Sequence, residues 1–391
     1  MEYLDRLPLL LDPIPDYHAA GLPYGVQAEL WLAEHPAPAG ELLRGCLAGG
    51  AGVLCAQTFG ANRFRLPENN ISGLNRKLLQ IAKDTASPSE IPVGGMVGPS
   101  GLFVPPHGDA DFDDIYDGYR EQIRALDEAG ADFLLLEGLG SLSDLRAALL
   151  AARTTGLPVM VLMSVDSDGH TMTGGNLLPA LITLQAMGAD AVGLSCDAEP
   201  DLAEEFRRAQ QHAAVPFAAR LNPGGLSPKE LAEAAVPFLE AGVRILGAGP
   251  GAGPEHTAAL AEAIKKYGPP NLPAEPDCDA AAIEQEAFFL GDDIILSKPI
   301  RCTSSLADDL IDLDDEQVTA ALVDVAGMDD AALLGAAGNM TRLPIAVHAD
   351  SPTVLDAALR YFQGRLIIDS DCQIERETIE PLAAKYGAII Y

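Results

Sequence analysis

The sequence predicts an α/β fold: a (β/α)8 TIM barrel followed by a smaller C-terminal α/β domain. Eight short apolar runs lack polar alternation, which is typical of parallel strands buried on both faces. Amphipathic segments lie between them, and several end in a glycine just before the next run. Eight such units over about 265 residues favour a closed barrel over an open doubly wound sheet.

The individual elements follow in order along the chain. The apolar runs are residues 7–12, 52–57, 92–97, 133–137, 158–164, 191–196, 216–222 and 244–248. The amphipathic segments include residues 119–129, 142–152, 177–187, 202–212 and 228–241. We therefore expect the barrel to occupy residues 1–267.

A second series of strands follows a proline-rich linker at residues 268–276. Its expected strands are residues 292–297, 320–325, 344–348, 365–369 and 387–391. The segment 277–391, about 115 residues, is too short for a second full barrel. It is either a small open α/β domain or half of a barrel.

Composition restricts the classes of partner. The chain carries 25 Lys and Arg against 57 Asp and Glu, a net charge of -32, which argues against nucleic acid and anionic membranes. This charge serves solubility or selects a basic partner protein. No apolar run reaches membrane-spanning length, and the acidic start, residues 1–5, lacks secretory features. Six cysteines without C-x-x-C spacing indicate reduced thiols in a cytoplasmic protein. The exposed strand edges of the segment 277–391 are covered either by the barrel or by a second chain in a homo-oligomer.

Functional side chains in such a barrel lie where the strands end. A carboxylate, a thiol and two carboxamides on one rim are suited to binding a small amino acid. The predicted substrate-binding residues are Asp12, Thr58, Phe59, Asn62, Glu137 and Asn222, with Cys196 as the candidate catalytic thiol.

Two of these residues, and the glycine-rich stretch that follows the last run, each have two interpretations. Glu137 is either a ligand-binding acid or a cap for the next helix. Cys196 is either a reactive thiol or an inert buried cysteine, the commoner outcome at such a position. The glycine-rich stretch 247–253 is either an ordinary turn from strand to helix or a phosphate cradle made of free N–H groups.

The rim residues, taken in this order, resemble the homocysteine S-methyltransferase family, including the homocysteine-binding barrel of cobalamin-dependent methionine synthase. The resemblance covers about residues 7–267. It rests on Gln-Thr-Phe-Gly-Ala-Asn at 57–62, Gly-Pro-Ser-Gly at 98–101, Leu-Glu at 136–137, Asp-Gly at 168–169, Thr-Gly at 173–174, Gly-Leu-Ser-Cys at 193–196, Asn-Pro-Gly at 222–224, and Gly251 with Pro-Glu-His at 254–256.

The resemblance implies a zinc site that this chain lacks in part. Members of the family hold zinc through three cysteines, and the zinc keeps the substrate thiol as a thiolate that attacks a methyl donor. Cys196 matches one of these cysteines, whereas the other two positions fall on Gly249 and Pro250. Cys55 stands where an acid is expected, and two thiols still fall short of a closed site. The expected zinc site is therefore incomplete.

The C-terminal segment resembles the first half of the pterin-binding barrel of methionine synthase. The basis includes residues 321–325, 343–350 and 367–370, and Asp369 stands where an Asn would contact the pterin. No D-x-H-x-x-G pattern of a cobalamin segment is visible. Two hypotheses follow: a methyltransferase relative that binds a small thiol or amino acid, or a non-catalytic partner of a corrinoid or methyltransferase protein.

Overall fold

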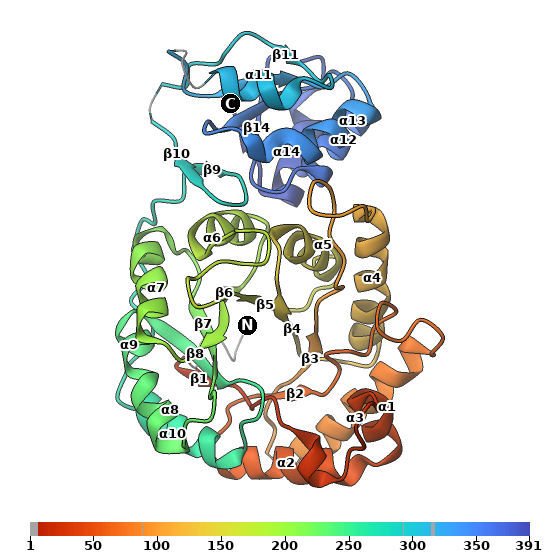
Figure 1. Ribbon diagram of the computed structural model, residues 1–391, viewed down its shortest axis with the longest axis vertical. Helices are drawn as coiled ribbons and strands as arrows, with labels where there is room; N and C mark the ends of the chain where they lie inside the picture. Colours follow the sequence, from red (N-terminus) through yellow and green to blue (C-terminus); the bar gives the residue numbers. More distant parts are fainter. Residues whose placement is uncertain (1–6, 88, 292, 314–316) are drawn as a thin grey trace.

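A parallel sheet of eight strands forms the centre of the molecule. The computed structural model describes residues 7–87, 89–291, 293–313 and 317–391. The sheet order is β1-β8-β7-β6-β5-β4-β3-β2, and the sheet curls into a ring with helices outside it (Figure 1). The (β/α)8 barrel is therefore confirmed. Its strands are β1 (Leu9–Leu10), β2 (Leu54–Ala56), β3 (Val93–Val97), β4 (Phe133–Leu139), β5 (Val159–Ser164), β6 (Ala191–Asp197), β7 (Phe217–Asn222) and β8 (Val243–Ala248).

The surrounding helices are α1 (Ala28–Glu34), α2 (Pro36–Ala48), α3 (Ile71–Ala86), α4 (Phe112–Glu128), α5 (Leu142–Ala152), α6 (Leu177–Ala186), α7 (Ala203–Ala209), α8 (Pro228–Ala234), α9 (Val236–Glu240) and α10 (Pro254–Ile264). Helix α4 begins earlier than expected because the Asp111 side chain accepts a hydrogen bond from Asp113 N. The segment expected as one helix at 228–241 is two helices, with Pro237 in the first turn of α9. None of the described helices is long and apolar enough to cross a membrane.

Alternation along the strands separates two apolar layers. Phe133 and Leu135 belong to the cluster inside the ring, whereas Leu134 and Leu136 belong to the layer between strands and helices. The interior is tight: a Cβ atom on Gly94, the register partner of Phe133, would lie 2.2 Å from the Phe133 ring. The barrel is therefore a packed core whose function must lie at its mouth.

The ring has a seam between β1 and β2, which share no ladder in the described sheet. Two hydrogen bonds bridge the seam. Gly52 N donates to Leu10 O at 2.9 Å, and Cys55 N donates to the Asp12 carboxylate at 2.9 Å. The side chain of Asp12 thus takes the place of a backbone acceptor.

The C-terminal part contains a hairpin, β9 (Ala280–Ala282) and β10 (Ala287–Phe289), and a parallel sheet of order β11-β12-β13-β14-β15. Its strands are β11 (Ile300–Arg301), β12 (Ala321–Asp324), β13 (Ile345–His348), β14 (Ile367–Ile368) and β15 (Ile389–Ile390). Its helices are α11 (Leu306–Asp312), α12 (Met328–Ala337), α13 (Pro352–Tyr361) and α14 (Arg376–Tyr386).

The strand expected at 292–297 is wrong in its extent. Only an isolated bridge joins Leu296 to Ala320, and the first strand of the sheet is β11. Ser297 Oγ accepts the hydrogen bond from Leu322 N at 3.0 Å, so a side chain interrupts the ladder there. Asp292 and residues 1–5 lie outside the described residues.

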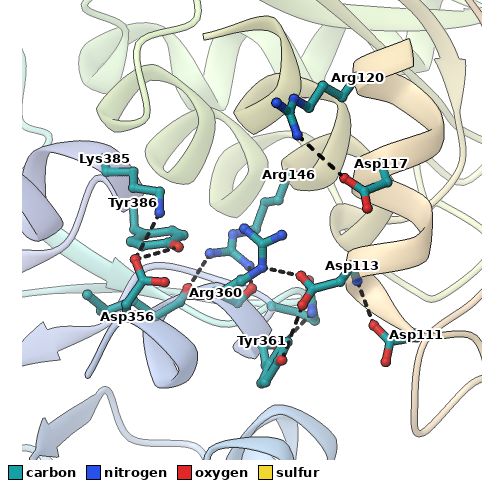
Figure 2. Close-up of polar contacts among 12 residues, drawn as sticks. Asp111, Asp113, Asp117, Arg120, Arg146, Asp356, Arg360, Tyr361, Lys385 and Tyr386 are labelled. Carbon is teal, nitrogen blue, oxygen red and sulfur yellow. Dashed lines mark hydrogen bonds and ion pairs between the residues drawn. The ribbon is translucent and has the colours of Figure 1, made fainter. Parts of the chain in front are cut away.

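A buried arginine joins the two parts of the chain. Arg146 of α5 is 1% exposed and donates to Leu359 O at 2.7 Å, to Arg360 O at 3.1 Å and to Phe362 O. Its guanidinium therefore caps the last carbonyls of α13 (Figure 2). Beside it, Arg360 pairs with Asp113 of α4, so the C-terminal sheet is attached to the barrel through side chains of both parts.

Candidate functional site at the barrel mouth

Two of the predicted acids meet at the mouth of the barrel, around an arginine. Glu137 lies on the inward face of β4, and Arg220 lies on the inward face of β7, two residues before that strand ends. Arg220 Nε lies 2.8 Å from Glu137 Oε2, and Arg220 Nη1 donates to Asp12 O at 2.6 Å and to Ala248 O at 3.0 Å. All three charged residues are at most 1% exposed.

Arg220 is the residue that the sequence analysis missed. It stands within the apolar run 216–222, which by itself predicts only a buried strand. The signal was present, because Arg220 precedes the predicted rim residue Asn222 by two positions and so shares its face of the strand. A charged side chain on the inward face of a buried strand is rare unless it is paired.

Charge and burial compete in this cluster. Burial raises the pKa of Asp12 to about 6, although the Arg220 charge and the hydrogen bond from Cys55 oppose that rise. Burial by itself lowers the pKa of Arg220, but Glu137, Cys55 and Asp12 together outweigh it, and the pKa is raised. The Cys55 thiol has a raised pKa because it is buried beside Asp12. Arg220 therefore stays charged, and Asp12 titrates in a mildly acidic range.

Three polar atoms of the cluster have no hydrogen-bond partner. They are Asp12 Oδ2, Glu137 Oε1 and Arg220 Nη2. An unpartnered buried donor or acceptor costs about 1–3 kcal/mol, more for charged groups. The cluster thus presents two acceptors and one donor whose hydrogen-bonding capacity is not used within the protein.

The residues from Thr58 to Asn62 follow β2 and form the part of the rim next to this cluster. Thr58 Oγ1 donates to Met96 O at 2.7 Å and accepts from Met96 N at 3.0 Å, so it ties the end of β2 to β3. Phe59 is half-buried against the inner cluster, with the Arg65 guanidinium 5.6 Å from its ring centre. Asn62 is fully buried, accepts from Arg65 N at 3.1 Å and leaves its Nδ2 unpartnered.

Asn222 lies on the rim beside the glycine-rich loop. Its Nδ2 donates to Asp197 Oδ1 at 3.1 Å, and its Oδ1 is buried without a partner. A Cβ atom on Gly249 would lie 2.1 Å from Asn222 Oδ1. Asn222 therefore occupies the space that a side chain at position 249 would need.

Cys196 is not brought together with these residues. It pairs in register with Leu221, and both belong to the layer between strands and helices, on the face opposite Asp197 and Asn222. Burial, followed by the charges of Asp197 and Glu137, raises the pKa of its thiol to about 12. Cys55 lies inside the ring instead. No three His, Cys, Asp or Glu residues in the described part of the chain form a group suited to a metal ion.

The glycine-rich loop after β8 uses its own N–H groups. Gly249 N donates to Leu221 O at 2.8 Å, Gly251 N to Ile14 O at 3.0 Å, and Gly253 N to His256 Nδ1 at 3.1 Å. His256 is thus a cap at the start of α10. The geometry favours an ordinary turn over a phosphate cradle, since these donors already have partners.

Comparison with known proteins agrees with the fold. A model of the homocysteine S-methyltransferase family matches residues 17–264. The methionine synthases of Mycobacterium leprae and Mycobacterium tuberculosis are each 27% identical, over 377 and 392 residues; the alignments cover 82% and 87% of this chain but 31% and 33% of those proteins. The chain thus spans about a third of the length of these relatives.

Solved structures show the same barrel. The homocysteine methyltransferase MmuM from Escherichia coli in its metallated form superimposes with a TM-score of 0.57 at 21% identity, covering 65% of this chain and 95% of MmuM. Its oxidized form gives 0.57 at 22% identity, covering 66% and 97%. The family model matches well over half of the chain, so this protein belongs to the homocysteine S-methyltransferase family.

Proposed function

We propose that the barrel mouth binds a small amino acid or amino-acid thiol, and that it does so without the zinc-thiolate site of the family. The cluster of Asp12, Glu137 and Arg220 carries this proposal. An amino acid at neutral pH bears an ammonium and a carboxylate. The unpartnered carboxylate oxygens Asp12 Oδ2 and Glu137 Oε1 suit the ammonium, and Arg220 Nη2 suits the carboxylate.

The zinc-independent part of the proposal rests on the donor set. Zinc in proteins takes thiolate, imidazole and carboxylate ligands. Gly249 and Pro250 offer none of these, and Asn222 fills the space beside position 249. Cys196 faces the helix layer with its thiol protonated. We infer that these residues do not fit zinc, so the predicted roles of Cys196 as metal ligand and catalytic thiol are not supported by its surroundings.

Calorimetry tests the binding step. We expect methionine or homocysteine, titrated into the full chain under reducing conditions, to bind with measurable heat. Glu137→Gln should weaken this binding at least tenfold, because it removes a charged acceptor. Glu284→Gln is the matched control, since Glu284 is also a buried glutamate but lies in the C-terminal hairpin. No heat with either ligand would refute the binding proposal, and about one zinc per purified chain would refute its zinc-independent part.

A second candidate is a non-catalytic partner of a corrinoid or methyltransferase protein. The ion pair favours it, because Arg220 already supplies a cation to Glu137 and leaves less need for a ligand. Co-migration with a corrinoid protein in size-exclusion chromatography, together with no heat from amino acids, would support this candidate. A cytoplasmic location is part of both proposals, supported by six cysteines that are all free thiols.

A further inference from the structure

A groove of about 420 Å³ lies where the barrel meets the C-terminal part. One wall is the loop after β3 together with the start of α4, and the other is α12 with Tyr361 at the end of α13 and Gln363 after it. We call it the junction groove. Its volume is within the range of sites for small molecules. It is separate from the mouth cluster, since none of Asp12, Glu137 and Arg220 lines it.

Apolar side chains form the body of the junction groove. Val104 and Phe112 line the barrel side, and Met328 and Ala332 line the side of α12. Gly335 lets α12 lie close to the end of α13, because a Cβ atom at this position would lie 2.8 Å from Tyr361 O. Met328 is 47% exposed, so an apolar molecule in the groove would remove apolar surface from water.

The charged residues that line the junction groove are all acidic. They are Asp109, Asp111 and Asp329, and none of the described residues that line it is a Lys, Arg or His. Asp111 uses its Oδ1 to accept from Asp113 N. The neighbouring cation, Arg360, is already paired with Asp113, as Figure 2 shows. The groove therefore carries three carboxylates among its lining side chains, in a chain of net charge -32.

A buried acceptor on the inner wall points to a ligand independently of charge. Gln363 lines the groove and is 4% exposed. Its Nε2 donates to Tyr361 O at 2.5 Å, which leaves Oε1 as a buried atom without a partner. A buried carbonyl oxygen of this kind is stabilised when an N–H donor reaches it.

We propose that the junction groove binds a small organic cation, an ammonium group carried on an apolar body. The apolar body packs on Phe112, Met328 and Ala332, and the ammonium faces the aspartates with Gln363 Oε1 as an additional acceptor. A bare metal ion does not match the apolar walls. The bound molecule touches both the barrel and the C-terminal part, so binding stabilises their attachment.

The test compares two probes of similar shape and opposite charge on the full chain at low ionic strength. Phenethylamine is the cation and 3-phenylpropionate is the anion, and binding is followed by ligand-observed NMR and calorimetry. We expect phenethylamine to bind and 3-phenylpropionate not to. Ala332→Phe, which fills the groove, should abolish binding. Asp329→Asn should weaken it about two- to fivefold, as expected for one exposed charge pair, and added salt should weaken it further.

Asp308→Asn is the matched control, because Asp308 is an exposed acid in the first turn of α11 and does not line the groove. It should leave phenethylamine affinity unchanged. Three results would each overturn the proposal: no binding of phenethylamine at millimolar concentration, equal binding of both probes, or undiminished binding to a folded Ala332→Phe variant. Equal weakening by Asp308→Asn and Asp329→Asn would also overturn it, because the effect would then reflect net charge alone.

Discussion

The buried guanidinium of Arg220 stabilises the charged state of the Glu137 side chain beside it. Arg220→Met leaves Glu137 buried without its cation, so we expect the free energy of unfolding at pH 7 to fall by about 3–5 kcal/mol. Glu137→Leu combined with Arg220→Met should recover most of this loss, because the two apolar side chains leave no unpaired charge. Urea unfolding of the four proteins in this cycle measures the coupling. Additive effects of the two substitutions would contradict the buried pair.

Asp12 should give the protein a measurable pH dependence. Its pKa is raised from 3.8 to about 6 in the folded state, mainly by burial. Between these values the folded state keeps a proton that the unfolded chain releases, so this contribution is present at low pH and is lost as pH rises through about 6. Relative to Asp12→Asn, the wild type should lose about 2.4 kcal/mol of stability from pH 4 to pH 7.

Urea unfolding of both proteins at several pH values checks this expectation. Asp144 also has a pKa of about 6, but it is present in both proteins and cancels in the difference. A difference that stays constant across this range would mean that Asp12 is not desolvated as its burial indicates.

At the scale of elements, the turn between β8 and α10 decides whether a metal site can be restored. Installing thiols by Gly249→Cys and Pro250→Cys should give no stoichiometric zinc. The new side chain at 249 meets Asn222 Oδ1, and Cys196 faces the other way. The double variant should also be less stable than the wild type, because overpacking typically costs about 1–3 kcal/mol. Metal content after dialysis against zinc measures the first effect, and one tightly held zinc would contradict it.

The strands of the barrel could be predicted because a strand that is buried on both faces consists of a continuous apolar run. The run 133–137 became β4 with Glu137 at its inner end, as alternation requires. The face of the sheet on which the Cys196 side chain lies could not be predicted, because a shift of one residue in register moves it between the barrel mouth and the helix layer. Arg220 could have been found by the same counting from Asn222. The hydrogen bond from Leu322 N to Ser297 Oγ could not be predicted, because a side chain that replaces a backbone acceptor leaves no periodic signal in the sequence.

At the scale of the whole molecule, Arg146 holds the two parts together. It donates to three carbonyl oxygens at the end of α13, pairs with no carboxylate in the described part of the chain, and has its pKa lowered to about 10 by burial. Arg146→Met leaves those carbonyl oxygens without a hydrogen-bond donor. We therefore expect the free energy of unfolding to fall by about 3 kcal/mol or more, and proteolysis at residues 268–276 to become faster. Arg120→Ala is the control, because its exposed pair with Asp117 is worth about 0–1 kcal/mol. Equal proteolysis rates for the two variants would contradict the role of Arg146.

The seam in the ring has a consequence for the order in which the molecule assembles. Leu9 pairs with Ile245, and the described sheet gives β1 no other ladder partner. During synthesis β2 to β7 can pair with their neighbours as each emerges, whereas β1 must wait for β8 and close a loop that encloses nearly the whole barrel. We therefore expect ring closure to be a late event of folding, and until it occurs Asp12 has neither Cys55 nor Arg220 beside it.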